Sequence, residues 1–260
     1  MTYSCAYFRS PEDTLEQAQQ QKYEHICRKL QLQEGETLLD VGCGWGGMLI
    51  YAAQKYGIEG LGNTLSQHQY EYANRKIKEM GLQGQIEVVL EDYRHLTGKF
   101  DKFVSIGMFE HVGKEYIPDF MRKASELLNQ GGLGLLHTIG KETDSSGDLW
   151  TTQYIFPGAY VPNLPEIAYY LGRTGLSILD VENLRMHYAK TLDLWAQNFE
   201  KNIEKVREMF EETFVRMWRL YLHASSAGFK YAENRLYQFL FSNGLNNQLP
   251  MTREHLCDNR

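Results

Sequence analysis

Short runs of apolar residues alternate with longer stretches of mixed polarity through the first half of the chain. The apolar runs predict strands at 37–41, 58–62, 86–90, 100–106 and 133–138. The stretches between them predict helices at about 10–32, from 46, from 66 and through 127. Ser10 and Pro11 suit the start of the first helix, and the Gly131-Gly132 pair suits the turn before the fifth strand. Such alternation is typical of a parallel sheet with helices on both faces.

The second half of the chain departs from this regular pattern. Residues 139–165 are polar and predict a loop, whereas 176–183 and 235–241 predict two further strands. Residues 189–231 are helical and rich in aromatic side chains; they could cover an apolar pocket, but their periodicity alone favours ordinary packing against the sheet. We expect one α/β domain over 1–242, with a mostly parallel seven-stranded sheet, and a polar, mobile tail at 243–260.

Composition narrows the classes of function. The net charge of -6 over 260 residues argues against a general nucleic-acid-binding protein, which needs clustered Lys and Arg. No apolar run approaches the roughly 20 residues that cross a bilayer, and the first residues lack the order of a signal peptide, so we expect a cytoplasmic protein. The four cysteines, at 5, 27, 43 and 257, form no CxxC pair and predict reduced thiols without a metal site.

A glycine-rich turn follows the first predicted strand. Its G-x-G-x-x-G spacing, which begins at Gly42, also fits dinucleotide-binding folds and keeps a dehydrogenase as one interpretation. Asp40 precedes the glycines, however, and its carboxylate attracts the ammonium or sulfonium of S-adenosylmethionine but repels a pyrophosphate. The position where a dinucleotide fold places an acid for the ribose falls at Asn63, so Asn63 or Gln69 would have to replace it. These two details favour S-adenosylmethionine.

A second polar turn follows the third predicted strand. There the carboxylate of Asp92 can accept hydrogen bonds from an adenine amino group, and the ring of Tyr93 can line the base. An ordinary capped turn explains these residues equally well.

Several motifs outside the glycine turn resemble those of one enzyme family. Read together, in order from residue 3 to about 241, they are similar to the catalytic domain of the cyclopropane fatty acyl phospholipid synthases and mycolic acid cyclopropane synthases. Phospholipid-type members usually carry an additional amino-terminal domain, so we expect this chain to match the catalytic domain alone. Its short loop at 140–153 is closer to the phospholipid enzymes. The motifs are YSCAY (3–7), LLDVGCGWGG (38–47), TLS (64–66), SIGMFEHV (105–112), HTIG (137–140), YIFPG (154–158) and HYAKTL (187–192).

The resemblance implies a Rossmann-like class I methyltransferase fold in which residues 189–231 cover an acyl pocket. It also implies S-adenosylmethionine as methyl donor, an unsaturated phospholipid acyl chain as acceptor, bicarbonate as base, peripheral association with the inner membrane face and a possible homodimer. By motif, the bicarbonate site comprises the side chains of Cys5, Glu110, His137 and Tyr188 and the backbone of Ile139. The S-adenosylmethionine site comprises Tyr3, Ser4, Asp40, Gly42, Gly44, Gly46, Thr64, Leu65, Gln69, Asp92 and Tyr93.

The chemistry suits these residues. An alkene cannot be activated by deprotonation, so it must be aligned with the sulfonium methyl in a dry pocket, where each aromatic face stabilises the resulting carbocation by roughly 0.5–2 kcal/mol. A bound oxyanion can then remove a proton from the transferred methyl group. Taken singly, His137, Tyr188 and Cys5 are ordinary packing residues, and His111 is interpreted as structural; their joint occurrence in the motifs favours function.

Three alternatives remain beside the dehydrogenase. The same carbocation could give a methyl or methylene branch, or the fold could methylate an oxygen or nitrogen of a small molecule. From another class, the chain could be a silent lipid- or S-adenosylmethionine-binding protein, because a fold does not guarantee its chemistry.

Overall fold

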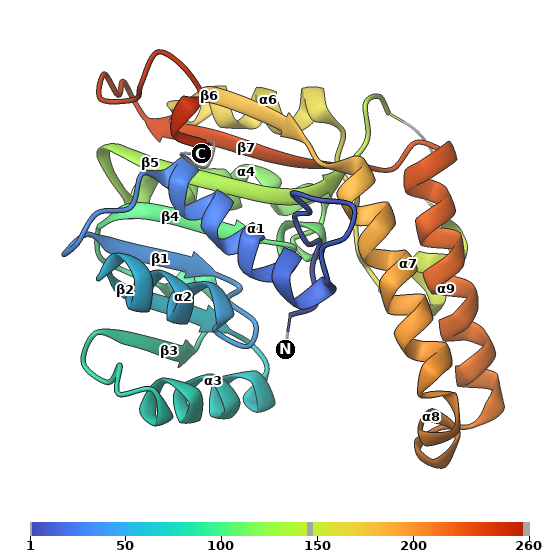
Figure 1. The fold of residues 1–260 in the computed structure, drawn as a ribbon. Coiled ribbons are helices and arrows are strands. Elements are labelled where there is room, and N and C mark those ends of the chain that lie inside the picture. The colour runs from blue at the N-terminus through green and yellow to red at the C-terminus, as the bar shows by residue number, and fades with distance from the viewer. Residues whose placement is uncertain (1, 145–147, 257–260) are drawn as a thin grey trace.

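The strands form one sheet in the order β3-β2-β1-β4-β5-β7-β6. The computed structural model describes residues 2–144 and 148–256 (Figure 1). Strands β1 to β5 run parallel to their neighbours, and β7 runs antiparallel to both β5 and β6. The predicted mostly parallel seven-stranded sheet is therefore confirmed. The strands are β1 Thr37–Val41, β2 Glu59–Thr64, β3 Ile86–Leu90, β4 Phe100–Ile106, β5 Leu128–Gly140, β6 Leu176–Asn183 and β7 Arg235–Asn243.

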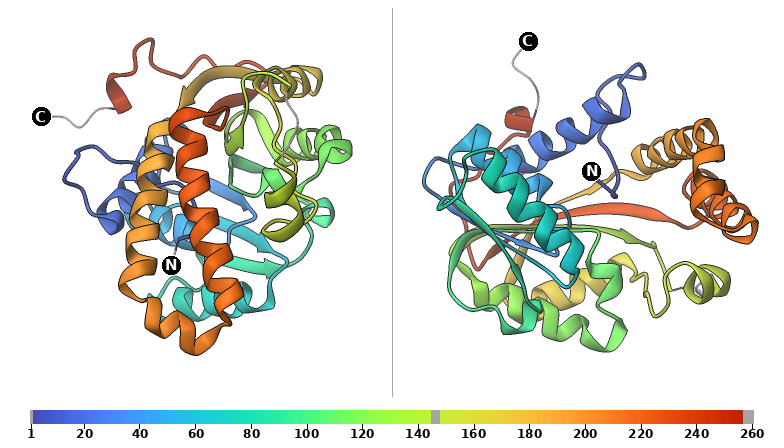
Figure 2. Two further views of the ribbon diagram at one scale, coloured as in Figure 1. Left: turned by 90° about the vertical axis from the view of Figure 1, so that its right-hand side faces the viewer. Right: turned by 90° about the horizontal axis from the view of Figure 1, so that it is seen from below.

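Helices cover both faces of the sheet (Figure 2). On one face, α1 (Leu15–Leu30), α2 (Gly47–Tyr56) and α3 (Gln67–Glu79) bury an apolar cluster against the strands. On the other, α4 (Ile117–Leu127) and α6 (Leu164–Arg173) bury a second cluster. Within the described residues, none of these helices has the length and apolar character needed to span a bilayer.

The late helices stand at the end of the sheet instead of lying on a face. Helices α7 (Arg185–Lys201) and α9 (Glu212–Tyr231) pack against each other, and the short α8 (Ile203–Met209) joins them (Figure 1). A third apolar cluster lies between this pair, the amino-terminal segment and β7. The helical prediction for 189–231 is confirmed, but the periodicity-based prediction of ordinary packing on the sheet is wrong, because the apolar stripes of α7 and α9 face each other.

Several local predictions need correction. The first helix begins at Leu15, because Thr14 forms a capping box with Gln17; Ser10 instead lies in a turn closed by the carboxylate of Asp13. The Gly131 pair lies inside β5, which already begins at Leu128, although Gly131 does adopt the positive φ of 76° expected of a turn.

The remaining corrections concern segments predicted to be irregular. The polar stretch 139–165 contains a short helix, α5 (Leu149–Tyr154), and the start of α6. The tail is attached through residue 256, contrary to prediction: Asn246 donates a hydrogen bond of 2.7 Å to the carbonyl of Gly131, and Arg253 pairs with Asp180. Its last part, 257–260, lies outside the described residues.

Candidate active site

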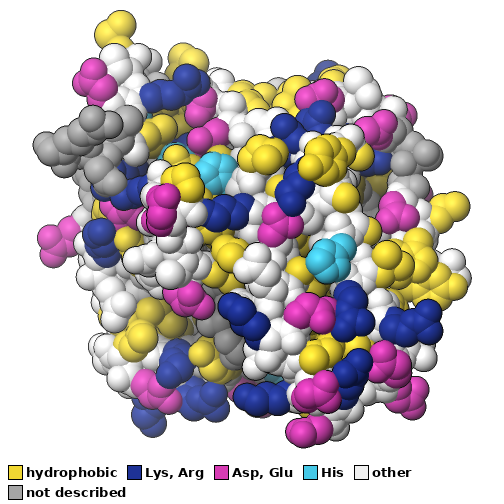
Figure 3. All heavy atoms as spheres, turned by 45° about the vertical axis from the view of Figure 1, so that its right-hand side comes forward, with side chains coloured by type: hydrophobic (Ala, Val, Ile, Leu, Met, Phe, Trp, Pro, Cys, Tyr) yellow, Lys and Arg dark blue, Asp and Glu magenta, His cyan; other side chains and the backbone are white. Residues whose placement is uncertain are grey.

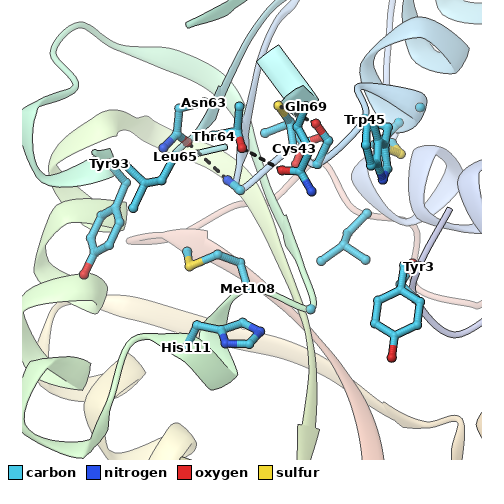
Figure 4. Close-up of a pocket in the computed structure, with 18 of the residues that line it drawn as sticks. Tyr3, Cys43, Trp45, Asn63, Thr64, Leu65, Gln69, Tyr93, Met108 and His111 are labelled. Atoms are coloured by element: carbon cyan, nitrogen blue, oxygen red, sulfur yellow. Dashed lines mark hydrogen bonds between the residues drawn. The ribbon is translucent and has the colours of Figure 1, made fainter. Parts of the chain in front are cut away.

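A cavity of about 680 Å³ opens at the carboxyl ends of the parallel strands. It lies where the strand order reverses between β1 and β4, which is the usual ligand position in an open α/β sheet. Figure 4 shows Tyr3 on one side of this cavity and Tyr93 on the other, with the loop after β2 between them. Ten of the residues predicted to hold S-adenosylmethionine line it: Tyr3, Ser4, Asp40, Gly42, Gly44, Thr64, Leu65, Gln69, Asp92 and Tyr93.

The glycine turn after β1 allows backbone to form the cavity wall. Gly42 has φ of 76°, and a Cβ there would lie 2.5 Å from Cγ of Met108. Gly44 also has a positive φ, and the space beside its Cα is open. Gly46, by contrast, is not among the residues that line the cavity; it caps α2, and a Cβ there would lie 3.1 Å from Cβ of Ala73. The assignment of Gly46 to the S-adenosylmethionine site stays a prediction.

The last residues of β2 brace this turn. Asn63 accepts a 3.1 Å hydrogen bond from the amide of Gly42 and donates one of 2.9 Å to the carbonyl of Glu91 (Figure 4). Its amide group is thereby committed to backbone. Thr64 donates to Oε1 of Gln69 at 2.7 Å, which aims Gln69 along the cavity wall. Both candidates for ribose recognition, Asn63 and Gln69, line the cavity, and Asn63 also braces backbone.

Asp40 is the buried acid of this cavity. Its side chain is 2% exposed, and Oδ1 has no hydrogen-bond partner among the described residues. Burial raises the pKa of Asp40 to about 7, a shift that the nearby Lys22 opposes. A cation placed against Oδ1 would supply the missing partner and favour the ionised carboxylate.

The turn after β3, which contains Asp92 and Tyr93, is both a capped turn and part of the cavity wall. Oδ1 of Asp92 accepts a 2.9 Å hydrogen bond from the amide of Arg94, and the two side chains form an ion pair, which lowers the pKa of Asp92. Tyr93 meets Phe120 edge-on at 5.3 Å. The turn is capped, and both residues also line the cavity.

A second cavity of about 610 Å³ adjoins the first. The two share Tyr3, Ser4, Gly107 and His111 as a common wall. Aromatic and aliphatic side chains of the amino-terminal segment, α7 and α9 enclose the second cavity, as the resemblance implies for residues 189–231. All five residues assigned by motif to the bicarbonate site line it: Cys5, Glu110, His137, Ile139 and Tyr188.

Glu110 presents one free carboxylate oxygen at this cavity. It lies in a short 3₁₀ helix after β4, and its Oε1 accepts a 2.6 Å hydrogen bond from the backbone amide of Ile139. Oε2 is buried without a partner in the described part of the chain. Burial raises the pKa of Glu110 to about 7, so the carboxyl group can hold or release a proton near neutrality. The Ile139 amide is already occupied and acts by fixing Glu110.

Three further groups assigned by motif to this cavity, His137, Tyr188 and Cys5, are neutral donors. Nδ1 of His137 lies 3.1 Å from Nε2 of Gln238, and because an amide nitrogen only donates, the ring proton belongs on Nε2, which lacks a partner among the described residues. Burial lowers the pKa of His137 and raises those of Tyr188 and Cys5. The Cys5 thiol donates to the Ala6 carbonyl at 3.2 Å. An imidazole N–H and a phenol O–H thus line the same cavity as the carboxylate of Glu110.

Other residues of these walls were not assigned from the sequence. Lys22 lines the first cavity and is 1% exposed, although it occupies a position on the apolar face of α1. The sequence could have indicated Lys22 by its position, because it is a lysine among the apolar positions of the helical pattern. Met108 and Trp45 line the first cavity and Tyr221 lines the second; their apolar character alone does not distinguish them from core residues.

Neither cavity has the composition of a metal site. Within 2–144 and 148–256, there is no cluster of three or more His, Cys, Asp or Glu side chains that could hold a metal ion. Cys5, Cys27 and Cys43 are free and buried.

Solved structures share this fold. The cyclopropane synthase MmaA2 from Mycobacterium tuberculosis superposes with a TM-score of 0.88 at 32% identity, covering 93% of this chain and 90% of that one. The mycolic acid cyclopropane synthase CmaA1, complexed with SAH and CTAB, gives a TM-score of 0.88 at 33% identity with the same coverage. A coclaurine N-methyltransferase, 26% identical, gives 0.82. The expected methyltransferase fold is confirmed.

Sequence relatives agree with the structural ones. A probable fatty acid methyltransferase of Pseudomonas putida is 40% identical over 98% of this chain and 68% of its own length. The cyclopropane-fatty-acyl-phospholipid synthase of Escherichia coli K12 is 38% identical over 97% of this chain and 65% of its own length. The chain thus spans about two thirds of these relatives. Because the model of the mycolic acid cyclopropane synthetase family also matches residues 1–239, the chain belongs to that family.

Proposed function

We propose that the protein transfers the methyl group of S-adenosylmethionine to the cis double bond of an unsaturated phospholipid acyl chain and closes a cyclopropane ring. The observation that carries this proposal is the pair of adjoining cavities, one with a buried acid beside a glycine turn and one apolar with a proton-transfer cluster. The shared wall allows a methyl donor and an acyl chain to meet.

The first cavity suits S-adenosylmethionine. Asp40 offers an unpaired oxygen to a cationic group, the glycine turn offers backbone, and Gln69 lies where a ribose hydroxyl can bind. CmaA1, with the same fold, has been solved with SAH, the demethylated product of this donor.

The second cavity suits an alkyl chain. Tyr188 packs against Phe229 at 4.7 Å and edge-on to Trp195 at 6.2 Å, so aromatic faces surround the space in which a carbocation would form. CmaA1 was solved with CTAB, which carries a long alkyl chain. The aromatic faces favour a cation on the chain over the same cation in bulk apolar solvent.

Bicarbonate would act as the base in the second cavity. Its oxygens can accept hydrogen bonds from Nε2 of His137 and the phenol of Tyr188, and its hydroxyl can donate to the free Oε2 of Glu110. An ion held there by Glu110, His137 and Tyr188 would supply the base for the proton that leaves the transferred methyl group when the ring closes. Of the five residues assigned by motif, Ile139 serves by orienting Glu110 and Cys5 as a neutral part of the wall.

Access to phospholipid implies peripheral contact with the inner face of a membrane, in the cytoplasm. Exposed Met209 ends α8, exposed Phe210 follows it, and exposed Leu220 lies on α9. The face drawn in Figure 3 mixes apolar side chains with charged ones of both signs. This mixed surface supports apolar contact more than electrostatic attraction to anionic lipid. A homodimer is a further part of the proposal that rests on the resemblance alone.

A product assay tests the proposal. The protein is incubated with S-adenosylmethionine, bicarbonate and vesicles of cis-unsaturated phospholipid, and the released fatty acids are analysed by gas chromatography and mass spectrometry. We expect a product heavier by one methylene that lacks the double bond. A methylated chain that retains or gains unsaturation would instead support the branching reaction, which the name of the Pseudomonas putida relative also suits. No lipid product despite tight S-adenosylmethionine binding would favour another acceptor or a silent homologue.

A further inference from the structure

Lys22 is a fully buried lysine in the wall of the first cavity, and burial lowers the pKa of its amino group to about 7, so a nearby anion would favour its charged form. It lies on α1, its side chain is 1% exposed, and its Nζ donates a 2.7 Å hydrogen bond to Oγ of Ser4. The only other Lys or Arg that lines this cavity is Arg94, which is exposed and already paired with Asp92. Lys22 is therefore the cation that a ligand deep in the cavity would meet.

The hydrogen bonding of Lys22 is incomplete. An ammonium group has three N–H donors, and burial of a charge is costly unless charged or polar partners surround it. Ser4 takes one donor, and the carbonyl of Ser4 is itself held by Gln19 at 2.8 Å. Nζ also lies 4.5 Å from the centroid of the Tyr23 ring, and none of these contacts supplies an anionic partner.

Asp40 faces the same cavity with the opposite charge. No ion pair within 4.0 Å joins Lys22 to Asp40 in the described part of the chain, and Oδ1 of Asp40 is unpartnered. Both side chains nevertheless line the same cavity, and Lys22 opposes the rise in the pKa of Asp40. Two buried, opposite and separate charges on one wall match a ligand that is itself a zwitterion.

We propose that Lys22 binds the carboxylate of the methionine moiety of S-adenosylmethionine, while Asp40 binds the ammonium group of the same moiety. This inference rests on the proposed function and adds to it a specificity-determining residue. Lys22 then selects cofactors that retain the amino-acid carboxylate, and the two charges fix which way the zwitterion lies. The alternative is that Lys22 only holds Ser4 in the wall between the cavities.

Binding calorimetry with two ligands separates these roles. S-adenosylmethionine and its decarboxylated analogue share the sulfonium, the adenosine and the amine, and differ only in the carboxylate. Hydrogen bonds to charged groups contribute roughly 1.5–3 kcal/mol, so we expect the wild-type protein to bind S-adenosylmethionine about 10- to 150-fold more tightly than the analogue. In Lys22→Met this preference should fall to about threefold or less, with affinity for the analogue almost unchanged.

Lys29→Met is the matched control. Lys29 lies on the same helix, is also 1% exposed, and pairs with Glu182 at 2.6 Å outside both cavities. This variant should keep the wild-type preference between the two ligands. Thermal unfolding of both variants shows whether either fails to fold.

The outcomes are distinct. Equal loss of affinity for both ligands in Lys22→Met would overturn the inference and leave the structural role. If Lys22→Met does not fold, the test rests on the wild-type protein alone. Equal affinity of the wild-type protein for S-adenosylmethionine and its decarboxylated analogue would also overturn the inference. Failure of the wild-type protein to bind S-adenosylmethionine at all would instead remove the proposed function.

Discussion

The two cavities share a wall but are built differently. The first is formed largely by consecutive turns at the ends of β1, β2 and β3; Asn63 braces the backbone there through its bonds to Gly42 and Glu91, and Asp40 keeps one carboxylate oxygen for a ligand. The second draws its polar groups from distant segments at residues 5, 110, 137 and 188, and leaves Oε2 of Glu110 and Nε2 of His137 without partners. The first is organised to bind, and the second keeps buried groups available for proton transfer.

The largest expected effect concerns the second cavity. Glu110→Gln and Tyr188→Phe should each slow turnover by ~10²–10⁴-fold, because each removes one partner of the proton acceptor. The dissociation constant for S-adenosylmethionine, measured by calorimetry, should stay within about threefold of wild type, since neither residue lines the first cavity.

Tyr170→Phe is a suitable control for these variants. Tyr170 packs against the apolar cluster that α4 and α6 bury on the sheet, and it lines neither cavity. It should leave turnover unchanged. Wild-type turnover in both Glu110→Gln and Tyr188→Phe would remove the proposed base site.

A smaller effect is expected on stability as a function of pH. Burial raises the folded-state pKa of Glu110 from 4.5 to about 7. The stabilisation from this group is therefore complete below about pH 4.5 and is lost as the pH rises through about 7. Glutamine does not titrate, so between pH 5 and 8 the free energy of unfolding should shift in favour of Glu110→Gln by up to about 3 kcal/mol. Urea unfolding of both proteins at the two pH values measures this shift. If the difference in unfolding free energy between wild type and Glu110→Gln is the same at both pH values, Glu110 titrates normally.

The first cavity gives a matched pair of glycine variants. Gly42 and Gly46 have nearly equal positive φ values, 76° and 78°, so alanine should cost each about 1–2 kcal/mol of stability. Only at Gly42 does the added Cβ collide with Met108, which lines the cavity. Gly42→Ala should weaken S-adenosylmethionine binding by about 10- to 100-fold and Gly46→Ala by less than about threefold. An unchanged dissociation constant in Gly42→Ala would contradict binding of the ligand by this turn.

The smallest effect belongs to the shared wall. Tyr3 stacks on Trp195 at 4.8 Å, and its hydroxyl lies 3.1 Å from that of Tyr221. Tyr3→Phe keeps the stacking and loses one hydrogen bond, so thermal unfolding should show a loss of about 0.5–1.5 kcal/mol with turnover nearly unchanged. A tenfold or larger loss of turnover would place this hydroxyl in the chemistry.

The sequence predicted the sheet well because its strands are short apolar runs between turn residues. The ranges 86–90, 100–106 and 176–183 match β3, β4 and β6. Helix α6 was missed even though Asn163 caps it and Pro165 lies in its first turn, because its start falls within a polar stretch. The placement of α7 and α9 could not be read from periodicity, since an apolar stripe does not reveal whether it faces a sheet or another helix.

The two sites also differ in how far the sequence alone predicted them. The glycine turn and Asp40 are contiguous, so charge and spacing alone predicted the first cavity. Glu110, His137 and Tyr188 are far apart in the sequence, and only the family motifs brought them together. Lys22 was overlooked because burial, not identity, makes it unusual.

One isotope experiment tests the central claim, that a methyl group passes from the first cavity to an alkene in the second and then loses a proton there. The protein is given S-adenosylmethionine with a trideuterated methyl group, bicarbonate and cis-unsaturated phospholipid vesicles, and the fatty acids are analysed by mass spectrometry before and after catalytic hydrogenation. The account predicts a product that keeps two of the three deuterium atoms and has lost its double bond before hydrogenation. A lipid product that keeps all three deuterium atoms would contradict it.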